Sequence, residues 1–240
     1  DRGATFGAPT RIIPFNLPSV AMNAVVLSDG LLVVPFMTLR KPRFNWVVTS
    51  QDGAKTFSIP QFVTDTCDTW SELAADSTRG AYRDRLYWVC GTSEHIYVLH
   101  STDRGETWSA GTIVNQGLGP VHNPVVTVNR DGVVGVSWYD AREDPRSYRG
   151  EFACQHVFFT ASLDGGQSFL PEVKVSSAEN CSDTPANGEA GRRWRAGGDY
   201  HGLAAAADGR FHILWADSRE GIYQLRTASI RVVSKSRPAP

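Results

Sequence analysis

The segment Ser101-Thr102-Asp103-Arg104-Gly105-Glu106-Thr107-Trp108 carries a pattern that recurs along the chain. Its form is Ser-x-Asp-x-Gly-x-Thr/Ser-aromatic, and further copies lie at 162–169 and, with Ala54 in the glycine position, at 50–57. A partial copy covers residues 1–6. The four aspartates, at positions 1, 52, 103 and 164, are 51, 51 and 61 residues apart. A repeat of this length predicts an array of similar supersecondary units.

The residue types of the pattern are those of a hairpin turn. Ser and Asp side chains accept hydrogen bonds from the N–H groups of their own turn. Glycine adopts positive φ without a Cβ clash. The closing Trp or Phe can pack between neighbouring sheets. We therefore expect each copy to join two antiparallel strands.

The pattern resembles the Asp box, and the chain resembles the sialidase and BNR-repeat β-propellers over almost its whole length. The resemblance implies an all-β fold of four-stranded antiparallel blades, with about four blades present as part of a six-bladed propeller. It predicts one propeller domain over residues 1–233 and a tail over 234–240. In this family the Asp boxes lie on the face away from the active site.

Strand patterns and turns predict blades at about 19–63, 72–116, 121–176 and 199–230, preceded by an outer strand at 10–15. Arg231 stands where the last blade should carry a box aspartate, so that blade lacks a fourth strand of its own. Either the segment 10–15 supplies it and closes a four-bladed ring, or the chain is a piece of a six-bladed propeller. The half-box at the start favours the second alternative.

Composition narrows the function classes. The chain has 240 residues, of which 41% are hydrophobic, which suffices for a buried core. The net charge of -1 argues against binding to nucleic acid or an anionic membrane. No apolar stretch approaches the roughly 20 residues of a membrane span. We predict no cofactor and no metal site, since the cysteines lack zinc-site spacing, and the sequence leaves the oligomeric state open.

In a propeller, the loops between second and third strands and the connections between blades share one face, which is the substrate face in the sialidase family. Here the long segments 140–151 and 177–199 belong to it. Two second strands end in the same motif, Trp-x-Asp-x-Arg, at 138–142 and 215–219. In one interpretation Arg142 and Arg219, held by Asp140 and Asp217, bind a carboxylate or a sugar hydroxyl. In the other, each pair fastens its own loop to the next blade.

The first strands of the blades begin near the propeller axis, which places His122, Asn123, Asp199, Tyr200 and His201 near the centre of the substrate face. In retaining sialidases a tyrosine activated by a glutamate attacks the anomeric carbon. By resemblance, Tyr200 is the candidate nucleophile, while Asp199 and His201 tune it or bind sugar hydroxyls. The alternative for Tyr200 is a buried aromatic ring with a satisfied hydroxyl.

Three charged residues of the long loops complete the candidate site. Glu143 and Glu151 are the candidates for the assisting glutamate, because both lie in the expanded loop. Arg195 is a candidate anion contact, and its alternative is a solvated loop charge.

Four cysteines allow two disulfides, or are buried thiols. On the propeller map all four fall towards the substrate face, and the pairs Cys67–Cys90 and Cys154–Cys181 would fix its loops. The family resemblance favours a secreted or periplasmic location.

The resemblance implies an exo-α-sialidase type of glycoside hydrolase that acts on terminal acidic sugars of glycans. The alternatives are a non-catalytic propeller that binds a glycan or a protein through the same face, and a purely structural repeat domain.

Overall fold

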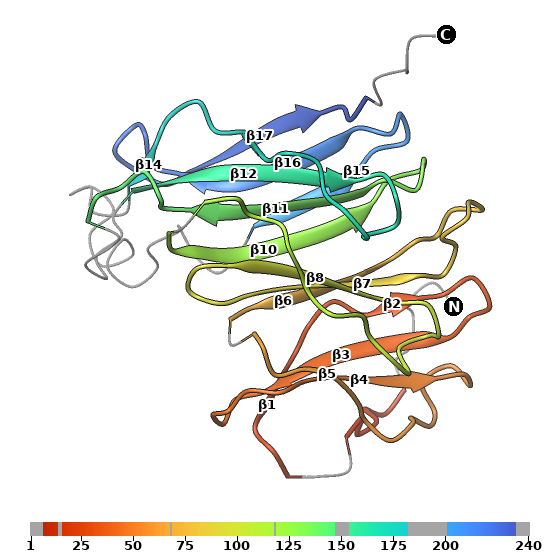
Figure 1. Cartoon of the computed structure of the whole chain (residues 1–240). Helices are drawn as coiled ribbons and strands as arrows, with labels where there is room; N and C mark the ends of the chain where they lie inside the picture. Colours follow the sequence, from red (N-terminus) through yellow and green to blue (C-terminus); the bar gives the residue numbers. More distant parts are fainter. Residues whose placement is uncertain are drawn as a thin grey trace, which may run out of the picture.

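The computed structural model describes residues 7–13, 16–67, 69–117, 119–146, 154–181 and 201–233. Their regular elements are all β-strands, grouped in four antiparallel sheets that stack one against the next (Figure 1). The prediction of an all-β fold built from antiparallel blades is confirmed. No helix of these residues is long and apolar enough to cross a membrane.

The first two blades each end in an outer strand that follows an Asp box. In the first blade, two short strands pair with the same neighbour, and the strands are β1 (Ser19–Ala21), β2 (Val25–Val26), β3 (Leu32–Thr38), β4 (Asn45–Ser50) and β5 (Gln61–Thr64). In the second blade the spatial order follows the chain, through β6 (Ser71–Ala75), β7 (Leu86–Gly91), β8 (Ile96–Ser101) and β9 (Thr112–Ile113).

The third blade is the largest and carries an extra pairing. Its strands are β10 (Val121–Val128), β11 (Val134–Asp140), β12 (Cys154–Ser162) and β13 (Val173–Lys174), and β14 (Asn180–Cys181) pairs with the start of β12. The fourth blade has three described strands, β15 (Gly202–Ala205), β16 (Phe211–Asp217) and β17 (Gln224–Ile230).

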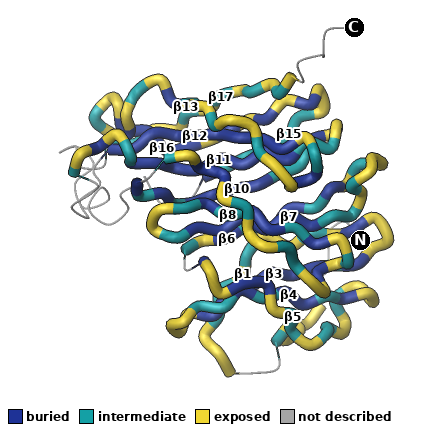
Figure 2. The backbone as a smooth tube through the Cα atoms, viewed as in Figure 1, coloured by how far each residue is buried: buried dark blue, intermediate teal, exposed yellow. Residues whose placement is uncertain are grey.

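The core lies between the blades. Every residue of the central strands β7 and β11 is buried, because each of these sheets is covered on both faces (Figure 2). One apolar cluster joins the first and second blades around Trp88, a second joins the second and third around Trp138, and a third joins the third and fourth around Phe211. Continuous burial of this kind explains why these strands are almost uninterrupted runs of apolar residues.

The Asp boxes form the predicted turns. The Ser101 hydroxyl donates to Asp103 at 2.8 Å and accepts the Gly105 N–H at 2.8 Å. The Asp103 carboxylate also accepts the Thr107 N–H at 2.9 Å and the Thr107 hydroxyl. The same contacts recur in the boxes at 50–57 and 162–169. The turn therefore satisfies its own polar groups, as the residue types indicated.

The prediction of an outer strand at 10–15 is wrong for residues 10–13, which are the part of this segment that the structure describes. Residues 10–13 form no strand, and the Arg11 guanidinium donates to the nearby Asn16 side chain at 2.7 Å. Ile13 instead packs against Val34, Phe36 and Val48 of the first blade. Burial of this side chain holds the segment on the first blade, so in the described part of the chain it does not serve as a fourth strand for the last blade.

The first strand of the first blade is divided into β1 and β2 by a break at 22–24. The half-box at 1–6, the tail 234–240 and residues 152–153 lie outside the described residues.

Both predicted disulfides, Cys67–Cys90 and Cys154–Cys181, are present. The first ties the connection after the first blade to the end of β7. The second joins directly opposed residues of β12 and β14. Two disulfides are typical of proteins that fold in an oxidising compartment.

Ala54 and its glycine counterparts should respond oppositely to substitution. Ala54 has φ 66° and is only half-buried, so Ala54→Gly should raise the free energy of unfolding by about 1 kcal/mol by removing left-handed strain. Gly166 has φ 86°, and an added Cβ would lie 3.1 Å from Tyr87 Cε1, so Gly166→Ala should lower it by about 1–2 kcal/mol. Urea unfolding measures both, and Gly7→Ala, in open space, is the control. A lower free energy of unfolding for Ala54→Gly would contradict the inference that the backbone is strained at Ala54.

Candidate functional site

The starts of the four first strands surround a central cavity of about 290 Å³. Its lining comes from every blade and consists of Ala21, Met22, Asn23, Trp70, Ser71, Glu72, Asn123, Pro124, Val125 and His201. A side cavity of about 300 Å³ is lined by Met37, Leu39, Arg43, Thr69, Trp70, His122 and Asn123. Since Trp70 and Asn123 line both, the two cavities adjoin.

Irregular backbone marks this cavity. The pairing of β10 with β11 shifts register between His122 and Val125, and Asn123 has φ 48°. The first blade is interrupted at the equivalent place, where Asn23 lies between β1 and β2. Asparagine tolerates left-handed backbone better than most residues. Such conformations concentrate at ligand sites, and here they allow two amide side chains to border one cavity.

Glu72 is the ionisable carboxyl group of the central cavity. It belongs to β6, and the Val126 backbone N–H of the next blade interacts with it. Burial raises its pKa to about 7, and the Val126 N–H opposes part of that rise. A carboxyl group with this pKa can give or take a proton near neutral pH. No motif in the sequence marks Glu72, although, like Asn123, it lies near the start of the first strand of a blade.

A row of rings backs the cavity. His201, only 8% exposed, places Nε2 2.9 Å from the Ser137 Oγ and meets the Tyr139 ring edge-on at 4.7 Å. Tyr139 stacks on His122 at 5.2 Å, and His122 Nε2 lies 2.5 Å from Gln155 Oε1. Burial lowers the pKa of His201 to about 3, with a further contribution from nearby His122. His201 is therefore neutral in the folded chain at ordinary pH.

Arg142 is fully engaged by neighbouring carboxylates. Its Nε donates to Asp140 at 2.8 Å, and its two Nη groups contact Asp140 and Glu172. The guanidinium also lies over the Phe158 ring, 4.6 Å from its centroid. The Trp138 indole N–H donates to the same Asp140 carboxylate at 3.2 Å. Because desolvation is outweighed by these hydrogen bonds, the pKa of Arg142 rises above its already high ordinary value.

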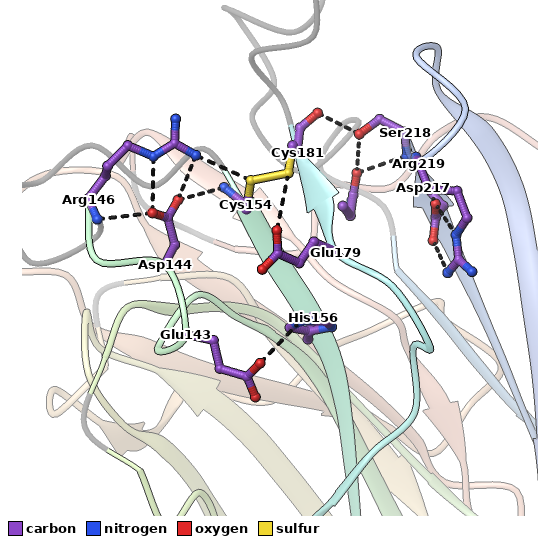
Figure 3. The surroundings of a disulfide bond; sticks show 11 residues. Glu143, Asp144, Arg146, Cys154, His156, Glu179, Cys181, Asp217, Ser218 and Arg219 are labelled. Carbon is purple, nitrogen blue, oxygen red and sulfur yellow. Dashed lines mark hydrogen bonds and ion pairs between the residues drawn. A yellow bond between two sulfur atoms is a disulfide. The ribbon is translucent and has the colours of Figure 1, made fainter.

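Arg219 repeats this arrangement one blade later. Its Nε donates to Asp217 at 2.8 Å (Figure 3). The Trp215 indole N–H donates to Asp217 at 2.9 Å, and Nη1 of Arg219 donates to Ser177 at 3.0 Å. Arg142 and Arg219 are not among the residues that line the central or side cavity. The described contacts of both arginines hold their loops in place, but Glu172 belongs to the same blade as Arg142, and Ser177 belongs to the connection before the blade of Arg219. The loops are therefore fastened to their own surroundings rather than to the next blade, which one interpretation of the Trp-x-Asp-x-Arg motif had predicted.

Glu143 lies beside the Cys154–Cys181 disulfide rather than at the central cavity. Its carboxylate accepts from Lys174 Nζ at 3.0 Å. It also lies 3.3 Å from His156 Nε2 (Figure 3). Burial lowers the pKa of His156. Glu179 approaches both disulfide sulfurs, but sulfurs bonded to each other are not thiolate ligands for a metal.

Four predicted site residues, Glu151, Arg195, Asp199 and Tyr200, lie outside the described residues, and their roles stay predictions. The structure brings His122, Asn123 and His201 to the two cavities. It places Asp140 with Arg142, and Asp217 with Arg219, in two ion pairs that hold the Trp-x-Asp-x-Arg loops.

No protein family and no curated protein matches the sequence, but solved structures match the fold. An α-L-arabinofuranosidase from Fusarium graminearum has 17% identity and a TM-score of 0.57 over 89% of this chain and 61% of its own. A Penicillium chrysogenum α-L-arabinanase has 18% identity and a TM-score of 0.58 over 91% and 63%. A Hadza microbial sialidase has 14% identity and a TM-score of 0.54 over 88% and 38%.

The chain spans about three fifths of the length of the first two of these proteins. At such low identity the likeness shows the fold alone, which is that of a partial propeller similar to propeller glycosidases.

Replacing Arg142 should cost stability. Arg142→Ala leaves the Asp140 and Glu172 carboxylates, 1% and 8% exposed, without their cation, and should lower the free energy of unfolding by about 3 kcal/mol. Arg210→Ala, which breaks an exposed ion pair with Asp208, is the control and should cost under about 1 kcal/mol. Unchanged stability with weaker sugar binding would instead make Arg142 a ligand contact.

Glu72→Gln should stabilise the chain only at higher pH. Below pH 4.5, the ordinary pKa, Glu72 is neutral in both the folded and unfolded states. Between there and about pH 7 only the unfolded chain ionises it, so the stability of the parent falls as the pH rises. Thermal unfolding should therefore show a higher Tm for Glu72→Gln at pH 8 and no gain at pH 4. Glu106→Gln controls for loss of one exposed charge, and an equal gain at both pH values would contradict the burial of Glu72.

Proposed function

We propose that the central cavity binds a terminal sugar residue of a glycan and that the chain carries the catalytic face of a propeller glycosidase. The observation that supports this most directly is Glu72. Its pKa of about 7 equips it as a proton donor or acceptor, and it lines a concave site together with Asn23, Asn123 and His201. A cavity with perturbed ionisable groups and a few convergent polar side chains is the usual form of a ligand site.

Glu72 has the properties of a general acid for glycoside cleavage. Glycosidases protonate the leaving-group oxygen with a carboxyl group whose pKa is raised by its surroundings. The amides of Asn23 and Asn123 can bind sugar hydroxyls. Trp70 is 42% exposed between the two cavities, so its ring face can carry the apolar face of a sugar.

The second reacting group in this proposal is the one predicted from the sequence. Glycosidases act with a second group that attacks the anomeric carbon or activates water. In the sialidase-type chemistry that the resemblance implies, this group is Tyr200, the chain neighbour of His201. Glu72 is then the general acid, and the glutamate that activates the tyrosine stays a prediction from the sequence. The sugar is then a terminal acidic sugar, whereas the fold likeness to an arabinanase supports a neutral pentose as the other class.

A non-catalytic glycan-binding propeller is the second candidate. Glu72 is the only carboxylate among the described residues that line the central cavity, and one carboxylate suffices to bind hydroxyls but not for a two-carboxylate mechanism. In either case we propose a secreted or periplasmic protein, and the two disulfides support that location.

The full chain should be assayed with a fluorogenic α-sialoside and an aryl α-L-arabinofuranoside. Glu72→Gln should lower kcat/KM by about 10²–10⁴-fold, since the amide cannot transfer a proton. If Glu72 is the acid, kcat/KM of the parent should fall as the pH rises above about 7.

Glu143→Gln is the matched control, because that glutamate contacts Lys174 and His156 outside the cavity. Turnover that Glu72→Gln leaves undiminished would contradict the catalytic proposal. Glycan binding without turnover, weakened by Glu72→Gln, would support the second candidate.

A further inference from the structure

We infer that His201 is an obligate hydrogen-bond acceptor for a hydroxyl group of the cavity's ligand, in a tautomer that Ser137 fixes. The tautomer follows from the geometry of the described residues. The identity of the ligand as a sugar rests on the proposed function.

The first step is the direction of the Ser137 hydroxyl. Its Oγ lies 2.8 Å from the Phe158 carbonyl oxygen. A carbonyl oxygen only accepts, so the single proton of the Ser137 hydroxyl points to Phe158. The Ser137 Oγ therefore has only lone pairs to offer to any other group.

The second step is the proton of His201. Its Nε2 lies 2.9 Å from the same Ser137 Oγ. Because that oxygen can only accept there, Nε2 must carry a hydrogen and donate it. A neutral imidazole holds one N–H, so Nδ1 is left with a bare lone pair. The ring is a neutral acceptor at Nδ1.

The third step is the surroundings of Nδ1. This atom is buried and has no hydrogen-bond partner among the residues that the structure describes. His201 lines the central cavity, as do Glu72 and Asn123. A buried acceptor without a donor is unfavourable, and a ligand hydroxyl in the cavity would supply the missing donor.

The fourth step is the rigidity of the ring. Tyr139 meets the His201 ring edge-on at 4.7 Å, and the Tyr139 hydroxyl accepts the Ala216 backbone N–H at 3.2 Å. Two residues of β11, Ser137 and Tyr139, thus fix the imidazole from one sheet. An acceptor held in this way selects for a hydroxyl donor and against a carboxylate, whose own lone pairs would face Nδ1. At this wall of the cavity the sugar presents a hydroxyl, whichever sugar class binds.

Nitrogen NMR tests the tautomer and the acceptor role separately. The full chain, labelled with ¹⁵N in its six histidines, is observed by long-range ¹H–¹⁵N correlation at pH 7, with His201 assigned through His201→Asn. We expect a protonated Nε2 and a bare Nδ1. L-Arabinose and N-acetylneuraminic acid are then added in turn, and the sugar that moves the carboxyl ¹³C signal of Glu72 should also move the His201 Nδ1 signal towards the hydrogen-bonded range.

Variants provide the controls. Ser137→Ala should allow the second tautomer of His201, whereas Ser176→Ala, which removes a hydroxyl 2.9 Å from Nδ1 of the other buried histidine His156, should move only the signals of His156. His201→Leu should weaken the affinity for the sugar about tenfold, and His201→Asn should restore part of it, since its amide oxygen can replace Nδ1.

Three results would overturn the inference. A protonated Nδ1 in the parent chain excludes the tautomer. A sugar that moves the Glu72 signal but not His201 Nδ1 excludes the acceptor role while leaving the proposed function in place. Failure of both sugars to move either residue contradicts the proposed function and the acceptor role together, even with the expected tautomer.

Discussion

Burial of the central strands on both faces is the constraint on which the rest of the structure depends. Every residue of β7 and β11 is buried, so each of these sheets needs a neighbour on either side. Stacking twisted sheets face to face around a common centre brings the starts of their first strands together. The central cavity exists because those starts converge from four blades.

Aspartate side chains stabilise loops on both faces of the stack, but their partners differ between the two faces. On the Asp-box side, the turns satisfy their own polar groups, and Gly105 and Gly166 pack against the preceding blade. On the cavity side, the Trp-x-Asp-x-Arg motifs fasten the loops through Asp140 and Asp217. The charged groups of these motifs contact one another and stabilise the loops, whereas the polar side chains that line the central cavity are placed to contact a ligand.

The central cavity combines groups whose protonation is set by burial. Desolvation keeps Glu72 protonated up to near neutral pH and keeps His201 neutral. The same physical effect thus gives one proton donor and one proton-poor acceptor, which line the same cavity. Such a pair suits a ligand rich in hydroxyl groups, each of which both donates and accepts.

The sequence by itself determined the blade order and the Asp-box turns, because hairpin chemistry is local and the repeat gives each residue a place on the propeller. It also predicted which cysteines would pair if they formed disulfides, and the structure shows that they do. It also brought His122, Asn123 and His201 into consideration, since first strands begin at the axis. Only the tertiary structure decided that Glu172 joins Asp140 as a partner of Arg142, that Ile13 covers the first blade, and that Glu72 borders the cavity. The reason is that each of these contacts joins residues that are distant in the chain, and no local pattern in the sequence encodes them.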